Sequence, residues 1–174
     1  MPKIIEHPRE RILQTAREKL FAQGYAGISL RDVAQSCGIA VGTIYNYFKD
    51  KDTLIASVMF EDWAKALKEM ELGCERAQTA AQGILEVYDA IRRFASLYES
   101  VWEQFSRAGG SSGVVSSRHG MLRGQIAQQL ETLLKRLGKE DAKLSPLLAE
   151  TVLSAAMQYD IAPEQLRVLA ERLL

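Results

Sequence analysis

Residues 29 to 51, SLRDVAQSCGIAVGTIYNYFKDK, constrain the fold more than any other segment, because they read as two short helices joined by a tight turn. Ser29 and Asp32 have the spacing of a helix N-cap followed by an acid in the first turn, which predicts a helix from about Leu30. Gly38 stands where a sharp exit from that helix usually needs φ > 0. The segment therefore predicts a helix-turn-helix.

The second of these helices leaves one side open. Ile44 and Phe48 recur at helical spacing, which packs one face back on the first helix. The other side carries a methyl group, a hydroxyl, an amide and a phenol, on Val41, Thr43, Asn46 and Tyr47. Such groups suit DNA, since Asn pairs bidentately with adenine and methyl groups meet the thymine methyl. The plainer alternative, a solvated face on a helical bundle, would instead be rich in Lys and Glu.

Three motifs keep a common register between Ile12 and Leu54. They are F-x-x-G-Y-x-x-x-S/T from Phe21 to Ser29, G-I/V-x-x-G-T-I/L-Y-x-Y-F from Gly38 to Phe48, and K-D-x-L from Lys51 to Leu54. Through them the first third of the chain resembles the DNA-binding domain of the TetR family of bacterial transcriptional regulators. For the remainder the resemblance is one of architecture, because the effector domains of this family diverge widely.

This resemblance implies an all-α fold in two parts. Residues 1–50 would form a three-helix DNA-binding domain with the helix-turn-helix, and residues 51–174 a C-terminal helical bundle for ligand binding and dimerisation. The implied function is transcriptional regulation, most simply repression, by a homodimer that binds a pseudo-palindromic double-stranded DNA operator and is released by a small-molecule effector.

Carried over motif by motif, the resemblance also implies which residues meet DNA. The residues expected to read or brace the major groove are Arg31, Val41, Gly42, Thr43, Tyr45, Asn46, Tyr47 and Lys51. Lys51 would hold a backbone phosphate by its charge and by the helix N-terminus beside it. Because position 46 varies widely among relatives, the operator sequence does not transfer to this chain.

The charge distribution agrees with this expectation. The formal net charge of the 174 residues is zero, so the chain is not basic as a whole. Residues 1 to 52 carry eight Lys and Arg against six Asp and Glu, and the remainder by difference carries fourteen against sixteen. This weak polarity has the sign expected if the N-terminal part meets phosphate.

An enzyme and a protein–protein adaptor are the alternatives to a DNA-binding regulator. An enzyme would need a metal-ligand cluster, a nucleophile elbow or a phosphate loop; the sequence shows none, and His7 and His119 fall in a tail and a loop. We therefore predict no catalytic residue, metal or cofactor. A helical protein–protein adaptor that has lost DNA binding is the second alternative. The presence of Thr43, Tyr45, Tyr47 and Lys51 argues against it.

The cysteines and the apolar runs indicate the cellular environment. Cys37 and Cys74 have no CxxC or Cys/His spacing, so we expect reduced, half-buried thiols, with a redox switch as the alternative. The N-terminal MPKIIEHPRERI does not read as a signal peptide, and no apolar run approaches the length of a membrane span. A cytoplasmic protein without a membrane partner is predicted.

Apolar spacing predicts helices along the rest of the chain. Asp50 caps a helix that ends around Gly73, and Thr79 caps the next, whose long apolar stripe predicts a bend or break between Ala95 and Val101. The Gly- and Ser-rich residues 109 to 120 have a linker composition and are expected to form a mobile loop. Further helices are predicted at residues 8–24, 122–137 and 144–159 and from Pro163 onward.

The helix over residues 144–159 is apolar over most of its circumference, so it must be covered on two sides. Only one further helix follows, and a second copy of the chain is the economical cover, as the family resemblance also implies. The alternative is a helix buried inside its own bundle. The expected dimer-interface residues are Leu148, Val152, Leu153, Met157, Leu166 and Leu169.

The resemblance further implies an apolar or aromatic effector bound among the C-terminal helices. The candidate lining residues are Trp63, Tyr88, Tyr98, Trp102, Phe105, Met121 and Met157. Each of them could instead be plain core, since an aromatic stripe at helical spacing is also what a core looks like. Arg118, His119 and Arg123 could anchor an anionic ligand, or could simply be solvated.

Overall fold

The computed structural model describes residues 7–107, 112–158 and 161–174, and the side chains of 105–107, 112–118, 140 and 141 lie outside that description. The described residues form α-helices and one short 3-10 helix and include no strand, which confirms the all-α class. They divide into two compact units: the described residues within Met1–Asp62 and Ser100–Gly110 form one, and those within Trp63–Glu99 and Ser111–Leu174 form the other. Each unit is described by itself below.

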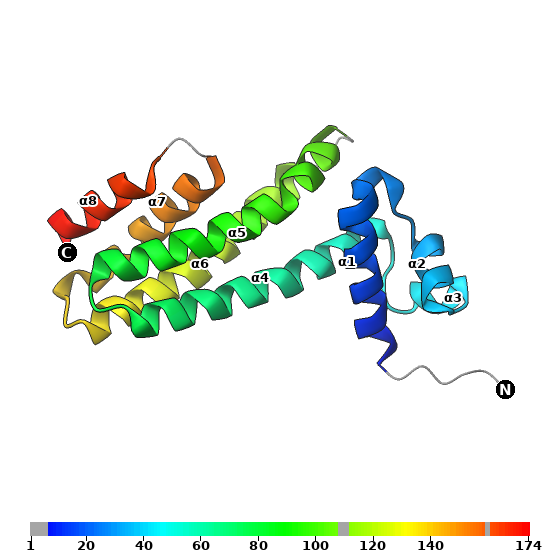
Figure 1. Ribbon diagram of the computed structural model, residues 1–174, viewed down its shortest axis with the longest axis horizontal. Helices are drawn as coiled ribbons and strands as arrows, with labels where there is room; N and C mark the ends of the chain where they lie inside the picture. The colour runs from blue at the N-terminus through cyan, green and yellow to red at the C-terminus, as the bar shows by residue number, and fades with distance from the viewer. Residues whose placement is uncertain (1–6, 108–111, 159–160) are drawn as a thin grey trace. The chain divides into compact units, whose positions relative to one another are not determined.

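The first unit is built from α1 (Pro8–Gly27), α2 (Leu30–Cys37), α3 (Val41–Tyr45) and the first part of α4 (Lys51–Arg76) (Figure 1). Its core is apolar; the buried residues include Ile12, Leu13, Ala16, Leu20, Val33, Ile44, Phe48, Leu54 and Val58. Helices α2 and α3, of eight and five residues, are too short to be stable alone, so packing supplies most of their stability.

Local capping chemistry sets the ends of these helices. The Ser29 hydroxyl accepts a hydrogen bond from the Asp32 amide at 3.1 Å, and α2 ends at Gly38 in the left-handed region at φ 68°. The backbone of α1 leaves helical geometry at Gly24, with φ 71° and ψ 175°. Helix α3 is shorter than the sequence suggests, but Phe48 still packs inward because its amide bonds the Ile44 carbonyl at 3.0 Å.

The second unit contains the later part of α4, α5 (Ala80–Arg107), α6 (Ser112–Arg136), the 3-10 helix η1 (Glu140–Leu144), α7 (Ser145–Gln158) and α8 (Pro163–Leu173). Figure 1 shows α4, α5 and α6 running alongside one another, with α7 packed on α6. The core between them is again apolar; its fully buried residues include Ile84, Val87, Ile91, Tyr98, Ile126, Leu130 and Leu134.

Three predicted boundaries are wrong. Helix α5 runs unbroken past Ala95–Val101, since this stretch keeps one buried face. Helix α4 continues past Gly73 to Arg76; Gly73 lies instead at a close crossing with α5, where a Cβ would lie 2.7 Å from Glu86 Cβ. Residues 112–120, predicted to be a loop, form the first part of α6. A helix can extend from a stable segment into residues of weak helix propensity, because each added residue gains a backbone hydrogen bond.

Gly83 marks another close helix crossing and offers a test of the packing. A Cβ built there would overlap the side chain of Leu133 on α6. Gly83→Ala should lower the free energy of unfolding, because overpacking costs about 1–3 kcal/mol and better helix propensity returns at most about 1 kcal/mol.

Gly124→Ala is the matched control for that substitution. Gly124 is exposed on α6, and a Cβ built there would meet no other side chain or element within 4 Å, so alanine there should raise the free energy of unfolding by about 0.5–1 kcal/mol. Urea denaturation of both variants measures the difference. If Gly83→Ala proved as stable as Gly124→Ala, the two helices could not cross this closely.

Candidate nucleic-acid interface

Helix α3 and the turn after it expose large side chains instead of burying them. Tyr45 is 54 % exposed, Tyr47 41 % and Val41 38 %, while Ile44 on the same helix is fully buried. Gly42 and Asn46 are also exposed, and Thr43 is half-buried. Apolar and aromatic groups clustered on a surface usually have a partner. The structure thus brings together on one short segment six of the eight residues predicted to meet DNA.

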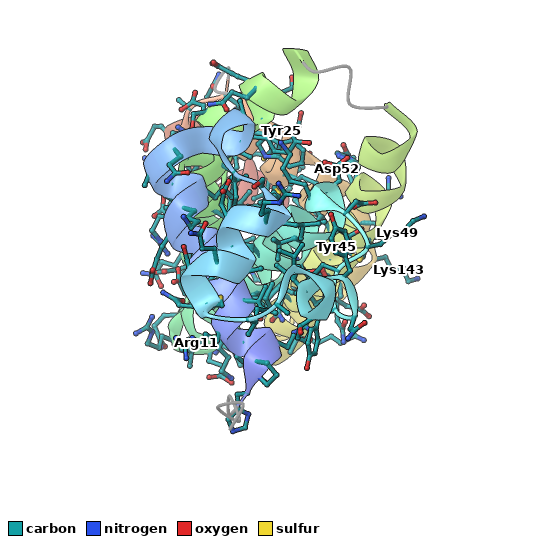
Figure 2. The ribbon with its side chains drawn as sticks, turned by 90° about the vertical axis from the view of Figure 1, so that its right-hand side faces the viewer. Arg11, Tyr25, Tyr45, Lys49, Asp52 and Lys143 are labelled. Atoms are coloured by element: carbon teal, nitrogen blue, oxygen red, sulfur yellow. The ribbon has the colours of Figure 1, made fainter. Side chains whose placement is uncertain are left out.

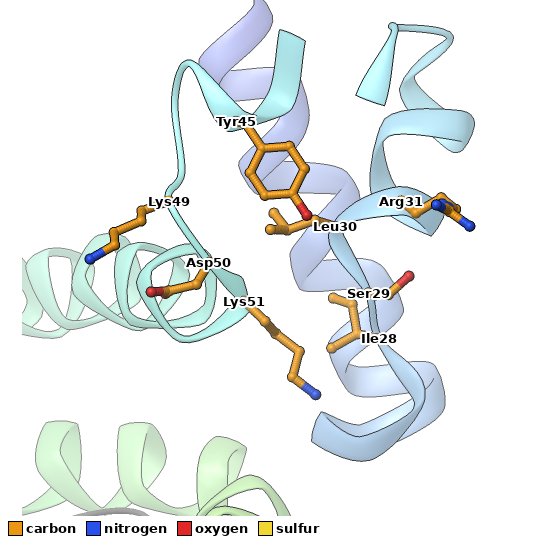
Figure 3. Close-up of a pocket in the computed structure, with 8 residues that line it drawn as sticks. All are labelled: Ile28, Ser29, Leu30, Arg31, Tyr45, Lys49, Asp50 and Lys51. Carbon is orange, nitrogen blue, oxygen red and sulfur yellow. The ribbon is translucent and has the colours of Figure 1, made fainter. Parts of the chain in front are cut away.

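A groove beside this segment is lined by both apolar and charged side chains (Figure 3). Its lining residues are Ile28, Ser29, Leu30, Arg31, Tyr45, Lys49, Asp50 and Lys51. Tyr45 reaches from α3 toward Leu30, and Arg31 and Lys49 stand exposed at the rim. A groove with three cations and one carboxylate, next to an exposed aromatic face, suits a sugar–phosphate backbone lying beside bases. Lys49 was not among the residues chosen from the sequence.

Asp50 in this groove is committed to the start of α4. Its Oδ1 accepts hydrogen bonds from the Thr53 hydroxyl and the Thr53 amide, both at 2.7 Å, which confirms the predicted cap. These bonds hold the pKa of Asp50 below its ordinary value, because they favour the ionised carboxylate. The acid therefore stays charged and fixes the helix start just after Lys49.

Lys51, predicted to hold a phosphate, has partners inside its own chain. Its Nζ donates to the Tyr25 carbonyl at 3.0 Å and lies 4.1 Å from the centre of the Tyr25 ring. The Tyr25 hydroxyl in turn donates to Asp52 Oδ1, and the two labelled side chains can be followed in Figure 2. Burial, with the hydrogen bond to Asp52, raises the pKa of Tyr25 to about 12, so its hydroxyl remains a donor at neutral pH.

Two contacts brace the helices that carry this surface. The Arg17 guanidinium on α1 pairs with Glu61 at 3.0 Å and with Asp62 at 2.9 Å on α4. Gln104 Oε1 on α5 accepts from the Ala26 amide at 3.1 Å, and its amide group lies against the Gly24 backbone. Gln104 was not predicted from the sequence, because 78 residues separate it from Ala26 and no local sequence pattern indicates the contact.

Both cysteines are buried and free. The Cys37 thiol donates weakly to the Thr15 hydroxyl at 3.3 Å, as expected for a thiol packed between α1 and α2. Burial raises the pKa of Cys74 to about 11, which keeps that thiol protonated at neutral pH. A protonated, buried thiol is a poor nucleophile.

The predicted ligand residues are divided between core and surface. Trp63 and Tyr98 are buried and both contact Phe94, with ring centres 5.2 Å apart in each pair, and Trp63 Nε1 donates to Gln125 at 2.8 Å. We call Trp63, Phe94 and Tyr98 the aromatic cluster. Phe94 was not chosen from the sequence, although it lies one helical turn from Tyr98 on the same stripe.

The other predicted ligand residues differ in burial. Tyr88 is buried on α5, whereas Met121 and Met157 are exposed. Trp102 is half-buried in the part of α5 that belongs to the first unit, and the Phe105 side chain lies outside the described residues.

Two of the three residues that could anchor an anionic ligand lie beside one acid, and the side chain of the third, Arg118, lies outside the described residues. His119 Nε2 lies 3.0 Å and the Arg123 guanidinium 3.5 Å from the Glu150 carboxylate, at a partly exposed site. With that carboxylate between them, they form no open anion site.

The packing of α7 overturns the argument used to predict the dimer interface. Leu148, Val152, Leu153 and Leu166 are buried within a single chain. Helix α6 packs along α7, and Arg92 on α5 donates to the α7 carbonyl of Ala156 at 3.0 Å, so one chain does supply enough cover. Leu169 is half-buried and Met157 is exposed. The exposed large apolar residues of α7 and α8 are Leu147, Met157, Val168 and Leu173.

Two properties of the described residues bear on other functions. None of the described helices is long and apolar enough to span a membrane. Nor do the described His, Cys, Asp and Glu side chains include a group of three that could hold a metal ion.

Comparison with known proteins places the chain among bacterial regulators. Residues 12–58 match the family described as "Bacterial regulatory proteins, tetR family". The HTH-type transcriptional regulator UidR of Escherichia coli (strain K12) is 25 % identical over 166 residues, which cover 95 % of this chain and 75 % of that protein. The HTH-type transcriptional repressor KstR2 of Mycolicibacterium smegmatis is 35 % identical over 57 residues, 32 % of this chain and 28 % of that protein.

A solved structure shares the whole fold. A TetR-family transcriptional regulator from Pectobacterium atrosepticum superposes with a TM-score of 0.68 at 22 % identity, covering 100 % of this chain and 95 % of that one. The helix-turn-helix with its exposed α3 surface, the matched family segment and the shared all-α architecture agree with one another. The chain belongs to the TetR family of bacterial regulatory proteins and is a DNA-binding transcriptional regulator, not an enzyme.

Proposed function

We propose that this regulator is a repressor, which binds a pseudo-palindromic operator as a homodimer in the cytoplasm and leaves it when a small molecule binds in the C-terminal part of the chain. The observation that carries the proposal is the exposed surface of α3, where Ile44 is buried and the aromatic and amide groups face outward. One relative is named a repressor, which agrees with the sign of regulation.

Some residues of this surface would contact bases and others the sugar–phosphate backbone. Thr43 and Asn46 would read base edges, with Val41 and Gly42 allowing close approach. Arg31, Tyr45 and Tyr47 would contact the sugar–phosphate backbone and set the register of the helix in the groove. In a twofold dimer the two α3 helices would enter successive major grooves about 34–36 Å apart.

A mobility-shift assay with DNA from upstream of the protein's own operon tests the proposal. A repressor should retain that fragment against excess competitor DNA at moderate salt. An adaptor or an enzyme would bind weakly and without regard to sequence. Weak binding of that kind to every fragment tried would contradict the proposal.

The dimer is proposed to form through the exposed apolar residues of α7 and α8. Leu147→Glu or Met157→Glu would bury a charge in such an interface, which is costly unless the charge is paired. We expect the unchanged protein to sediment at twice 19.4 kDa at micromolar concentration, and either variant at 19.4 kDa.

Leu72→Glu is the control for those variants, because Leu72 is an exposed leucine on α4, outside the proposed interface. It should remain dimeric. If Leu147→Glu and Met157→Glu also stayed dimeric and bound the operator normally, the interface would lie elsewhere.

The effector is proposed to contact the aromatic cluster and so to shift the later part of α4, which carries Trp63. A ligand changes DNA affinity only if it binds the two states of the protein unequally. Compounds found by thermal shift should therefore both stabilise the fold and release DNA. Phe94→Leu should blunt both responses, whereas Leu97→Ala, an exposed site on the same helix, should leave both intact. Stabilising ligands that never altered operator affinity would contradict this proposal.

A further inference from the structure

The side chains of Tyr25, Lys51 and Asp52 form a closed set of contacts, which we call the Tyr25 lock. The Lys51 ammonium donates to the Tyr25 carbonyl at 3.0 Å and lies 4.1 Å from the ring centre, and the Tyr25 hydroxyl donates to Asp52. Tyr25 thus contacts both Lys51 and Asp52, the first two residues of α4. A lysine held by a carbonyl and a ring would forfeit both contacts if it turned outward to a phosphate.

The lock joins two segments that are distant in sequence. Tyr25 directly follows Gly24, where α1 leaves helical geometry, and Ala26 on its other side is held by Gln104. Lys51 and Asp52 are the first two residues of α4, and only five residues separate α3 from Lys51. Fixing the start of α4 to the end of α1 therefore limits how far α3 can move in the free protein.

Other cations of the groove are better placed to meet phosphate. Arg31 on α2 and Lys49 before α4 are exposed, whereas Lys51 is half-buried. Figure 3 shows the Lys51 side chain extending away from Lys49 and toward Ile28. The side chains of Arg31 and Lys49 are thus exposed at the rim of the groove, whereas that of Lys51 is turned toward the protein.

We infer that Lys51 is a positioning residue, which with Tyr25 and Asp52 holds α4 and α3 in the DNA-reading arrangement, and that Arg31 and Lys49 neutralise the DNA phosphates at this groove. This inference rests on the proposed DNA binding, and it says which cations of the groove contact the DNA phosphates. It replaces the expectation that Lys51 itself holds a phosphate.

The dependence of DNA affinity on salt distinguishes the two roles. Each neutralised phosphate contributes about 0.9 to the slope of log K against log salt concentration, and a twofold dimer makes each contact twice. Arg31→Met and Lys49→Met should therefore each lower the magnitude of the slope by about 1.8. Lys51→Met keeps an aliphatic stem over the Tyr25 ring but removes the charge; it should weaken binding by the same factor at every salt concentration and leave the slope unchanged.

Two further variants complete this experiment. Tyr25→Phe keeps the ring and removes the hydroxyl bond to Asp52, so it should behave as Lys51→Met does. Lys68→Met removes a charge that pairs with Glu71 in the second unit, and it should change neither affinity nor slope. If Lys51→Met lowered the magnitude of the salt slope as much as Lys49→Met, the inference would be overturned, because Lys51 would then contact a phosphate.

Hydrogen exchange in the free protein tests the lock without DNA. Lys51→Met and Tyr25→Phe should speed exchange of the backbone amides in the first turn of α4, and Lys49→Met should not. Equal exchange in all three variants would overturn the lock even if DNA binding were sequence-specific. Conversely, faster exchange in a protein that bound no operator would sustain the lock and reject the proposed function.

Discussion

Replacing Ile44 with alanine should lower the free energy of unfolding of the helix-turn-helix by about 2–5 kcal/mol and abolish operator binding. Ile44 is the buried residue of α3, and Phe48 bonds back to its carbonyl. Removing its side chain leaves a cavity beneath a helix of only five residues, which makes few hydrogen bonds of its own. Because the chain has two units, hydrogen exchange of residues 30–48 is the suitable measurement.

Val41→Ala is the matched control, since Val41 lies on the same helix with its side chain exposed. It should change the free energy of unfolding by no more than about 0.5 kcal/mol. It should nevertheless weaken operator binding, because the valine methyl groups are proposed to meet DNA. If the two variants destabilised the helix-turn-helix equally, α3 could not pack through Ile44.

Replacing Asn46 or Thr43 with alanine should relax discrimination at particular base pairs by about 1–3 kcal/mol in each half-site. An amide or hydroxyl that reads a base edge distinguishes the correct base from the others, and alanine does not. Affinities for a panel of operators with single base-pair changes measure this effect. The unchanged protein should reject substitutions at the contacted pair, and the variant should tolerate them.

Arg31→Ala provides the contrast for those two variants. A lost phosphate contact should weaken binding to every sequence in the panel by a similar factor. The order of preference among operators should stay the same. Equal losses on all operators for Asn46→Ala and Thr43→Ala as well would mean that neither side chain reads bases.

Helix ends in the first unit were predictable because the chemistry that sets them is local. Ser29 bonds an amide three residues away, Gly38 supplies the left-handed exit, and Asp50 caps α4 through Thr53. The exposure of α3 was predictable for a related reason. A helix too short to bury all its large side chains must leave some of them to a partner.

Features that depend on distant packing were not predictable from sequence. Gly73 resembles a helix end but is a crossing point with α5, which only the position of Glu86 reveals. The apolar breadth of α7 shows that the helix is covered on several sides, but it does not say whether the cover is its own chain or a second one. In this chain α5 and α6 provide that cover.

The same distinction applies within the candidate site. The motif places Lys51 at the start of α4 but does not show that its ammonium bonds a carbonyl 26 residues earlier. Gln104 likewise reaches Ala26 from 78 residues away. Residue type and position could be assigned from sequence. The partners that decide what each side chain does could not.

Selection of genomic DNA fragments by the purified protein tests most directly whether α3 reads DNA as one of a symmetric pair. The account predicts strong enrichment of a pseudo-palindromic sequence whose half-site centres lie about one helical turn, roughly 10 base pairs, apart. Asn46→Ala should enrich the same spacing with relaxed preference at one base pair in each half-site. Fragments enriched without a shared sequence, or with one unrepeated site, would contradict it.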